Sequence, residues 1–113
     1  MKRATVLLVV MAGWPLLAIA QEPNNLNETQ RHGQQLLAQT CGVCHLRADP
    51  GARTYGPALN KAAANDDDEI MRDYITNGTP RMPGFKYYLK DDEISAIIAY
   101  VRTVPVPAAA PAR

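Results

Sequence analysis

Both cysteines of the chain and one of its two histidines lie in a single short stretch, Cys41-Gly42-Val43-Cys44-His45. Two thiols separated by two residues and followed directly by an imidazole have the spacing of a covalent haem attachment site. In such a site each thiol forms a thioether with one vinyl group of the haem, and the histidine binds the iron. The stretch therefore predicts one haem c, covalently attached through Cys41 and Cys44, with His45 as an iron ligand.

Three other kinds of site use the same residue types. A thioredoxin-type redox pair requires a βαβ context, which we do not find in this sequence. A zinc site would need His32 or carboxylates in addition to His45, and their spacing is poor for that purpose. A disulfide between Cys41 and Cys44 would close a very short loop and would therefore stabilise the fold little. Haem attachment is the interpretation that uses all three side chains of the motif.

Three side chains downstream of residue 20 could bind the iron opposite His45, namely Met71, Met82 and His32. Met71 falls on the apolar face of an expected helix, where methionine is more often part of the core. His32 is too close to the attachment motif in sequence to reach the opposite face readily. Met82 lies in the proline- and glycine-rich loop 79–85, which is long enough to cross that face. Ligation by both His45 and Met82 would leave no position for a substrate, which indicates electron transfer.

The N-terminal segment has the features of a secretory signal peptide. It begins with Met1-Lys2-Arg3, continues with an apolar run over residues 6–20 and ends in Ala18-Ile19-Ala20. An uncleaved membrane anchor would need a longer apolar run, so we expect cleavage after Ala20 and a periplasmic protein with no membrane span. Cleavage would change the formal net charge from +1 to −1, a balance that does not indicate binding to nucleic acid.

The remaining chain has the length of one small domain. We expect residues 21–26 to form a flexible lead-in and residues 27–105 to form the haem-binding domain. Residues 106–113 are rich in proline and alanine, and we expect a disordered tail there.

Helical patterns indicate how the motif is positioned. Asn27 and Gln30 predict a capping box at the start of a helix over about 28–39, which leads into Cys41. A loop is expected over 46–59, because this stretch contains several prolines and glycines. Together with the two helices described next, these features predict an all-α fold of three to four helices and long loops around one haem.

Two further helices are expected downstream. One covers about 66–76, with Asn65 or Asp66 as its N-cap and acidic residues near its positive end. The last covers about 91–103 and ends before Pro105. Its apolar side chains recur at the i, i+3, i+4, i+7 spacing of an amphipathic helix, at Ile94, Ile97, Ile98 and Val101.

In this order, the motifs resemble those of a small monohaem class I cytochrome c over roughly residues 29–105. The segments that carry the resemblance are Gly33 with Leu36 and Leu37, the motif 41–45, Gly56-Pro57-Ala58-Leu59, Arg81-Met82-Pro83-Gly84-Phe85, and the last helix with Tyr100. The resemblance implies that the Pro57 carbonyl accepts a hydrogen bond from the His45 ring and that Met82 is the distal ligand. It also implies that the first and last helices cross at Gly33. Lys90 stands where the family usually has a serine or threonine cap, so the cap is expected at Asp91.

The segment from Asn77 to Phe85, with the acidic start of the last helix, is more narrowly similar to the cytochrome subunit of p-cresol methylhydroxylase-type enzymes. This similarity implies a periplasmic flavoprotein dehydrogenase as the electron donor and a separate downstream acceptor. Small cytochromes that serve quinoprotein alcohol dehydrogenases share much of the pattern and provide an alternative. A haem enzyme or gas binder would be the function if Met82 were not an iron ligand, and a structural subunit of a complex is a third possibility.

Overall fold

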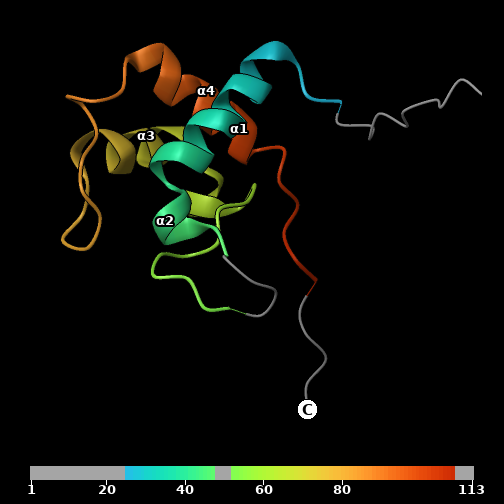
Figure 1. Ribbon diagram of the computed structural model, residues 1–113, viewed down its shortest axis with the longest axis horizontal. Helices are drawn as coiled ribbons and strands as arrows, with labels where there is room; N and C mark the ends of the chain where they lie inside the picture. The colour runs from blue at the N-terminus through green and yellow to red at the C-terminus, as the bar shows by residue number, and fades with distance from the viewer. Residues whose placement is uncertain (1–24, 48–51, 109–113) are drawn as a thin grey trace, which may run out of the picture.

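The computed structural model describes residues 25–47 and 52–108, and all regular elements within them are helical (Figure 1). They are α1 (Glu28–Thr40), α2 (Gly42–His45), the short turn η1 (Ala63–Asp66), α3 (Asp68–Asn77) and α4 (Asp91–Val101). Among these residues the only β-type pairing is an isolated bridge between Thr79 and Met82. The expected all-α fold of helices and long loops is therefore confirmed. The expected signal segment, most of the lead-in and most of the tail lie outside the described residues.

Helices α1 and α4 cross and form the centre of the molecule (Figure 1). Gly33 of α1 is buried at the crossing, where an added Cβ would lie 1.9 Å from the backbone oxygen of Ala96 in α4. No side chain fits at that distance, so the expected crossing at Gly33 is confirmed. The side chain of Gln34 also donates a 3.2 Å hydrogen bond to the hydroxyl of Tyr100. The core beside the crossing contains Leu37, Cys41, Met71, Ile75, Ile94, Ile97, Ile98 and Val101.

The start of α1 agrees with the capping box in the sequence. The Asn27 side chain accepts a hydrogen bond from the Gln30 backbone N–H at 2.9 Å, and the Gln30 side chain accepts one from the Asn27 N–H at 3.0 Å. These bonds use two donors that a helix start leaves without partners, and they fix where the helix begins. Helix α1 ends at Thr40, so the first cysteine of the motif is its C-cap.

The start of α3 differs from the expectation. The helix begins at Asp68, and its N-cap is Asp67, whose side chain accepts from the backbone N–H groups of Glu69 and Ile70 at 2.9 and 3.0 Å. The expected cap residues Asn65 and Asp66 instead have φ angles of 58° and 60°. Left-handed residues cannot continue into a right-handed helix, so the helix starts only after them.

Helix α4 also has different ends from those expected. Its N-cap is Lys90 rather than Asp91, and the Lys90 backbone N–H donates to a carboxylate oxygen of Glu93 at 2.8 Å. Its last residue is Val101 rather than Thr103, because Thr103 and Val104 bond to carbonyls three residues back in a tighter turn.

Within the described residues, we find no helix whose length and apolar character would suffice to cross a membrane.

Candidate cofactor site

A cavity of about 440 Å³ lies between α2, α3, α4 and the loops that join them. This volume falls within the range of roughly 300–1,000 Å³ that is typical of small-molecule and cofactor sites. Its walls are largely apolar, and Leu59, Ile75, Phe85, Ile97 and Val101 all contribute to them. Both cysteines, His45, Pro57, Met71 and Met82 also line the cavity. These are the site residues that the sequence predicted, together with Met71, which the sequence placed in the core rather than at the iron.

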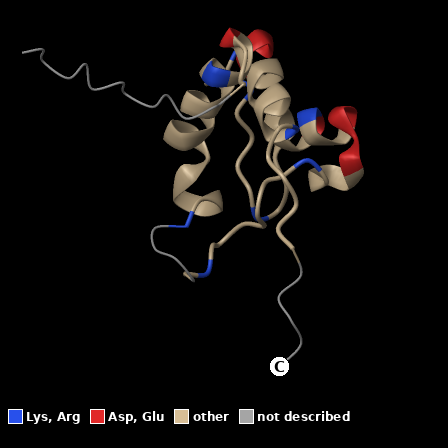
Figure 2. Ribbon diagram, turned by 90° about the vertical axis from the view of Figure 1, so that its right-hand side faces the viewer, with Lys and Arg blue, Asp and Glu red and all other residues tan. Residues whose placement is uncertain are grey.

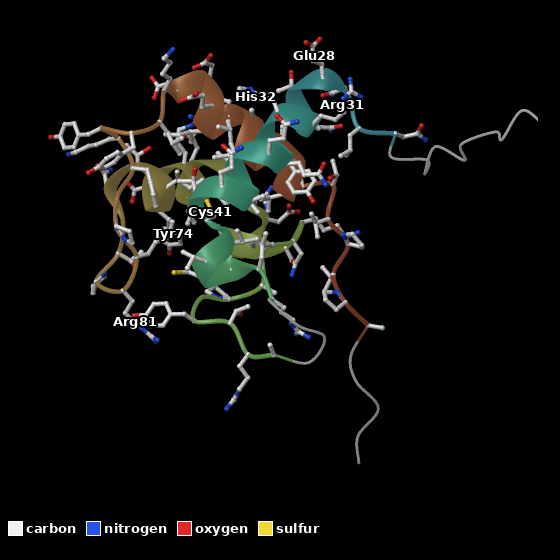
Figure 3. The ribbon with its side chains drawn as sticks, viewed as in Figure 1. Glu28, Arg31, His32, Cys41, Tyr74 and Arg81 are labelled. Carbon is white, nitrogen blue, oxygen red and sulfur yellow. The ribbon has the colours of Figure 1, made fainter. Side chains whose placement is uncertain are left out.

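The attachment motif is positioned by the junction of α1 and α2. Cys41 caps α1, and its carbonyl accepts hydrogen bonds from the N–H groups of Cys44 and His45 at 3.2 and 3.0 Å. This turn brings the side chains of residues 41, 44 and 45 to one cavity, and Figure 3 labels Cys41 where α1 meets α2. Both thiols are free. Burial, and secondarily the nearby Cys44, raises the pKa of the Cys41 thiol, so this thiol is neutral at pH 7 and suits an apolar wall.

A loop over residues 54–57 is held against the motif. The Gly56 N–H donates to the Cys44 carbonyl at 2.8 Å, and the Thr54 hydroxyl donates to the Gly56 carbonyl at 2.6 Å. A Cβ at Gly56 would lie 2.5 Å from Cε1 of the His45 ring, so only glycine lets the loop approach the imidazole this closely. This contact restricts how the ring can turn.

The orientation of the His45 ring is fixed from one side. Its Nδ1 lies 2.7 Å from the carbonyl oxygen of Pro57. A carbonyl can only accept, so Nδ1 carries the proton and Nε2 keeps its lone pair. An imidazole held in this tautomer can bind a metal ion through Nε2, and such an outer hydrogen bond also raises the basicity of the ligand. The contact between His45 and Pro57 that the resemblance implied is present.

Met82 lies in a tight turn that is fixed to the end of α3. Thr79 and Met82 exchange backbone hydrogen bonds of 2.8 and 3.1 Å, and the Phe85 N–H donates to the carbonyl of Ile75 in α3 at 2.8 Å. Gly78 has a φ of 79°, which favours glycine. A Cβ on Gly84 would come within 2.7 Å of the Asn77 backbone. The loop is therefore a rigid part of the wall rather than a free segment.

The other two candidate ligands lie in different surroundings. Met71 is a buried residue of the core cluster, as its helical spacing predicts, but it also borders the cavity. His32 is exposed on α1 and does not line the cavity (Figure 3). The structure thus brings His45 together with two methionines and leaves His32 apart.

The loops on the two sides of the cavity meet at its rim. The guanidinium carbon of Arg81 lies 5.2 Å from the centroid of the Tyr55 ring, within the range of a cation–π contact. Both residues also line the cavity. Arg53, another basic residue of these loops, is exposed and does not line the cavity.

Comparisons with known proteins agree with this geometry. A family model described as cytochrome C oxidase, cbb3-type, subunit III matches residues 28–101, which is more than half of the chain. The chain belongs to the cytochrome c family. It is an electron-transfer c-type cytochrome, and haem c is the cofactor that its family implies.

Three similar proteins come from different organisms and match different shares of the chain. Cytochrome c6 of Synechocystis sp. is 33% identical over 73 residues, which cover 62% of this chain and 61% of that protein. The cytochrome c subunit of 4-cresol dehydrogenase [hydroxylating] from Pseudomonas putida is 30% identical over 80 residues, covering 70% of this chain and 66% of that protein. The c-type cytochrome SorU from Sinorhizobium meliloti has a similar structure, with a TM-score of 0.52 and 32% sequence identity. The alignment covers 67% of this chain and 90% of SorU. The chain therefore spans less than two thirds of the length of the first two relatives.

The site of this cytochrome c fits the cofactor of its family. Two thiols and an imidazole at one end of an apolar cavity provide the attachment and ligand chemistry, and thioethers are available elsewhere in its wall. Gly56 also suits a haem-binding site, because its lack of a side chain leaves room for the ring of His45. The sequence indicated no individual role for Gly56, although Gly56 belongs to a segment that carries the family resemblance and directly precedes Pro57. The sequence also indicated no role for Arg102, whose partners are remote in sequence.

Proposed function

We propose that this cytochrome c is an exported carrier of single electrons, with one haem attached through Cys41 and Cys44 and ligated by His45 and Met82. The observation that carries the proposal is that His45 and Met82 line the same apolar cavity, with His45 Nδ1 hydrogen-bonded to the Pro57 carbonyl. We further propose that the signal peptide is cleaved after Ala20 and that the protein acts in the periplasm. It would work as an electron carrier rather than as an enzyme on its own.

Each group of residues around the cavity would have its own role in binding the haem. A bound haem would supply a one-electron couple. Pro57 and Gly56 hold the His45 ring in one orientation and one tautomer, so that Nε2 is available to the iron. The loop 79–85 presents Met82 from a fixed backbone. The apolar walls exclude water from the cavity. If His45 and Met82 both bound the iron, no position would remain on it for a substrate or a gas molecule.

The absorption spectrum of the oxidised protein tests this proposal against a haem enzyme or gas binder. Ligation by methionine gives a weak charge-transfer band at the red end of the visible spectrum, and the iron should be low-spin. We expect this band in the purified holoprotein, together with a reductive titration that takes up one electron per chain. A high-spin spectrum without the band would contradict ligation by Met82.

For the electron donor, we propose a flavoprotein dehydrogenase of the p-cresol methylhydroxylase type. The similarity to the 4-cresol dehydrogenase cytochrome subunit supports this choice. A quinoprotein alcohol dehydrogenase is the alternative donor. A comparison of the reduction rates of the holoprotein by the two classes of enzyme distinguishes them.

A surface suited to such a partner surrounds the cavity. Val43 is 93% exposed and Tyr55 is 63% exposed, and both line the cavity. Arg47, Arg53, Arg81 and Lys86 lie in or beside the adjoining loops, and we call these four residues the basic rim. The acidic residues drawn in Figure 2 gather instead in helices α1, α3 and α4, mostly at their starts. An apolar patch with a basic rim fits a partner that has an acidic docking surface.

The basic rim predicts a salt-dependent reaction rate. Reduction of the wild-type holoprotein by the flavoprotein should slow as ionic strength rises, because exposed charges steer association and salt screens them. Arg81→Gln and Lys86→Gln should each lower the rate at low salt, by roughly 2- to 5-fold, and should flatten its dependence on salt. Stopped-flow absorbance provides the measurement.

Lys90→Gln is the matched control for these rim variants. Lys90 is an exposed lysine at the start of α4, where its backbone rather than its side chain makes the capping contact. Its replacement should leave the rate and the salt dependence unchanged. If the wild-type rate does not change with salt, or increases with it, the basic rim does not attract the partner.

A further inference from the structure

One stretch of the cavity wall has an unusual backbone. Ala64, Asn65 and Asp66 have φ angles of 56°, 58° and 60°, and they are the only non-glycine residues in the described part of the chain with positive φ. A side chain on a left-handed residue comes close to the backbone, and since Asn and Asp tolerate this conformation better than other residues, the strain is greatest at Ala64. Ala63 and Ala64 line the cavity. A strained conformation persists only where the surrounding structure enforces it.

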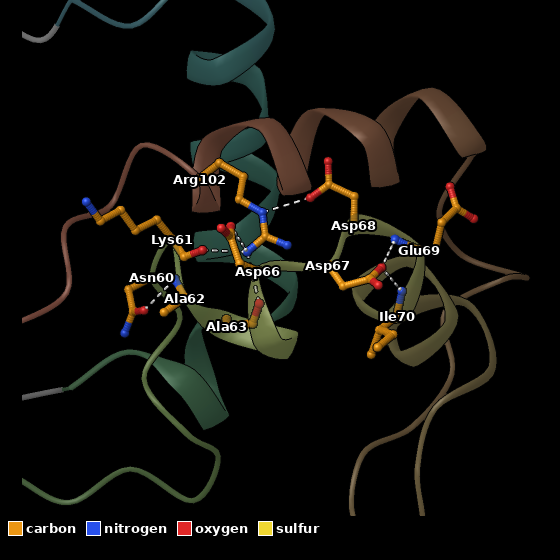
Figure 4. A network of polar contacts seen from close by, with 10 residues as sticks. All are labelled: Asn60, Lys61, Ala62, Ala63, Asp66, Asp67, Asp68, Glu69, Ile70 and Arg102. Atoms are coloured by element: carbon orange, nitrogen blue, oxygen red, sulfur yellow. Dashed lines mark hydrogen bonds and ion pairs between the residues drawn. The ribbon is translucent and has the colours of Figure 1, made fainter.

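Arg102 provides that enforcement from the end of α4 (Figure 4). Its Nη1 donates to the carbonyls of Lys61 and Ala63, at 2.7 and 2.9 Å, on the N-terminal side of the left-handed residues. Its Nε donates to the Asp68 carboxylate at 2.7 Å, on their C-terminal side, and Asp66 lies 3.7 Å from Nη1. One planar guanidinium therefore holds both ends of the segment 61–68.

The burial of these groups indicates which contacts matter most. The Arg102 side chain is 19% exposed, whereas those of Asp66 and Asp68 are 77% and 63% exposed. Water screens the two carboxylates, so the bonds to the backbone carbonyls hold the segment more firmly than the ion pairs. Nη2 of Arg102 is buried without a hydrogen-bond partner within the described structure, which is itself unfavourable. The fold thus keeps an unpaired donor on the residue that holds the strained, cavity-lining turn.

A second arginine, Arg72, connects two helices without contacting the strained turn through hydrogen bonds. Arg72 of α3 donates to the Ser95 hydroxyl at 2.8 Å and to the Asp91 carbonyl at 3.5 Å, both in α4. Arg72 thus also links α3 to α4, but its hydrogen bonds go to α4 and not to the left-handed segment. This difference separates the roles of the two residues.

We propose that Arg102 is a positioning residue for the cofactor cavity. By fixing the segment 61–68, it keeps Ala63 and Ala64 in place in the wall beside the haem. The closed wall limits the entry of water and of external ligands that compete with Met82. This inference rests on the proposed function, because it takes a haem ligated by Met82 as the occupant of the cavity.

The test uses the full-length holoprotein and imidazole as the external ligand. Arg102→Gln should increase the affinity of the oxidised protein for imidazole about tenfold, because the wall is no longer held closed. It should also lower the midpoint potential, since water then reaches the cofactor. Arg102→Lys should fall between this variant and the wild type, because lysine keeps the charge but not the fork of donors. Arg72→Gln is the matched control and should stay within about twofold of the wild type.

A double-mutant cycle shows whether Arg102 acts through the left-handed segment. Glycine adopts positive φ without a Cβ clash, so Ala64→Gly makes the segment less dependent on Arg102. The combined variant Ala64→Gly with Arg102→Gln should therefore gain less imidazole affinity than the two single changes predict together. The cycle subtracts the effect of the methyl group that Ala64→Gly removes from the wall.

Two results would overturn the proposal. One is an equal change in imidazole affinity for Arg102→Gln and Arg72→Gln, and the other is simple additivity in the cycle with Ala64→Gly. If Arg102→Gln does not fold, Arg102→Lys serves for the same comparison with Arg72→Gln. Failure of the proposed function would appear separately, as the absence of the methionine–iron band in the wild type. In that case the difference in midpoint potential between the Arg102 and Arg72 variants still decides the role of Arg102.

Discussion

A chain with both Cys41→Ser and Cys44→Ser is expected to carry no covalent haem and to yield little folded protein. The cavity occupies a large part of a small core. Without its occupant, the apolar wall of this cavity would be exposed to water or poorly packed, and both are unfavourable. The whole stability of a small domain is only about 5–15 kcal/mol. Each single substitution should leave one thioether or none. Absorbance under denaturing conditions measures attachment, and circular dichroism measures helix content.

Thr40→Ser is the control for the cysteine variants. Thr40 also lines the cavity and directly precedes Cys41, but serine keeps its hydroxyl and should preserve both attachment and fold. The explanation fails if the double cysteine variant accumulates as a fully helical protein without haem.

The second large effect is expected for Met82→Ala. Loss of the thioether should open the iron to cyanide or carbon monoxide. The potential should fall by a substantial part of the roughly 0.8 V range over which axial ligands set haem potentials. Its direction follows from the preference of a thioether ligand for reduced iron. Spectroelectrochemical titration gives the potential, and absorbance titration gives the affinity for cyanide.

Met71→Leu is the matched variant for this test, because Met71 borders the same cavity but belongs to the buried core. It should keep the methionine–iron band, the potential and the resistance to cyanide. The opposite pattern, with the band lost in Met71→Leu and kept in Met82→Ala, would assign the ligand to Met71 instead.

Local sequence signals predicted the parts of the fold that local contacts determine. The capping box of Asn27 and Gln30 set the start of α1 correctly, because both partners lie within one turn of the helix. The spacing of Ile94, Ile97 and Val101 likewise identified the buried face of α4. These signals depend on neighbours along the chain, and they can be recognised without a structure.

Features that depend on remote contacts were not predictable in this way. Asn65 and Asp66 resemble ordinary N-cap residues, but they are left-handed, and Arg102 bonds to backbone carbonyls of their segment about forty positions earlier in the chain. A backbone carbonyl carries no sequence signal, so these contacts were not visible. The contact between His45 and Pro57 was expected from family resemblance alone. Sequence spacing also separated Met71 from Met82, whereas the structure brings both to the cavity.

The crossing of α1 and α4 has a consequence for the order in which the protein matures. Gly33 and Ala96 touch across a long stretch of intervening chain that contains both cysteines, His45 and Met82. A chain made from its N-terminus exposes Cys41, Cys44 and His45 before α4 exists, and closing so long a loop is entropically unfavourable. Helix α4 also supplies Ile97 and Val101 to the cavity wall. Docking of the last helix on Gly33 and sealing of the cavity are therefore one event. Haem attachment to a growing chain would then precede that event and would act on an open, incompletely folded polypeptide.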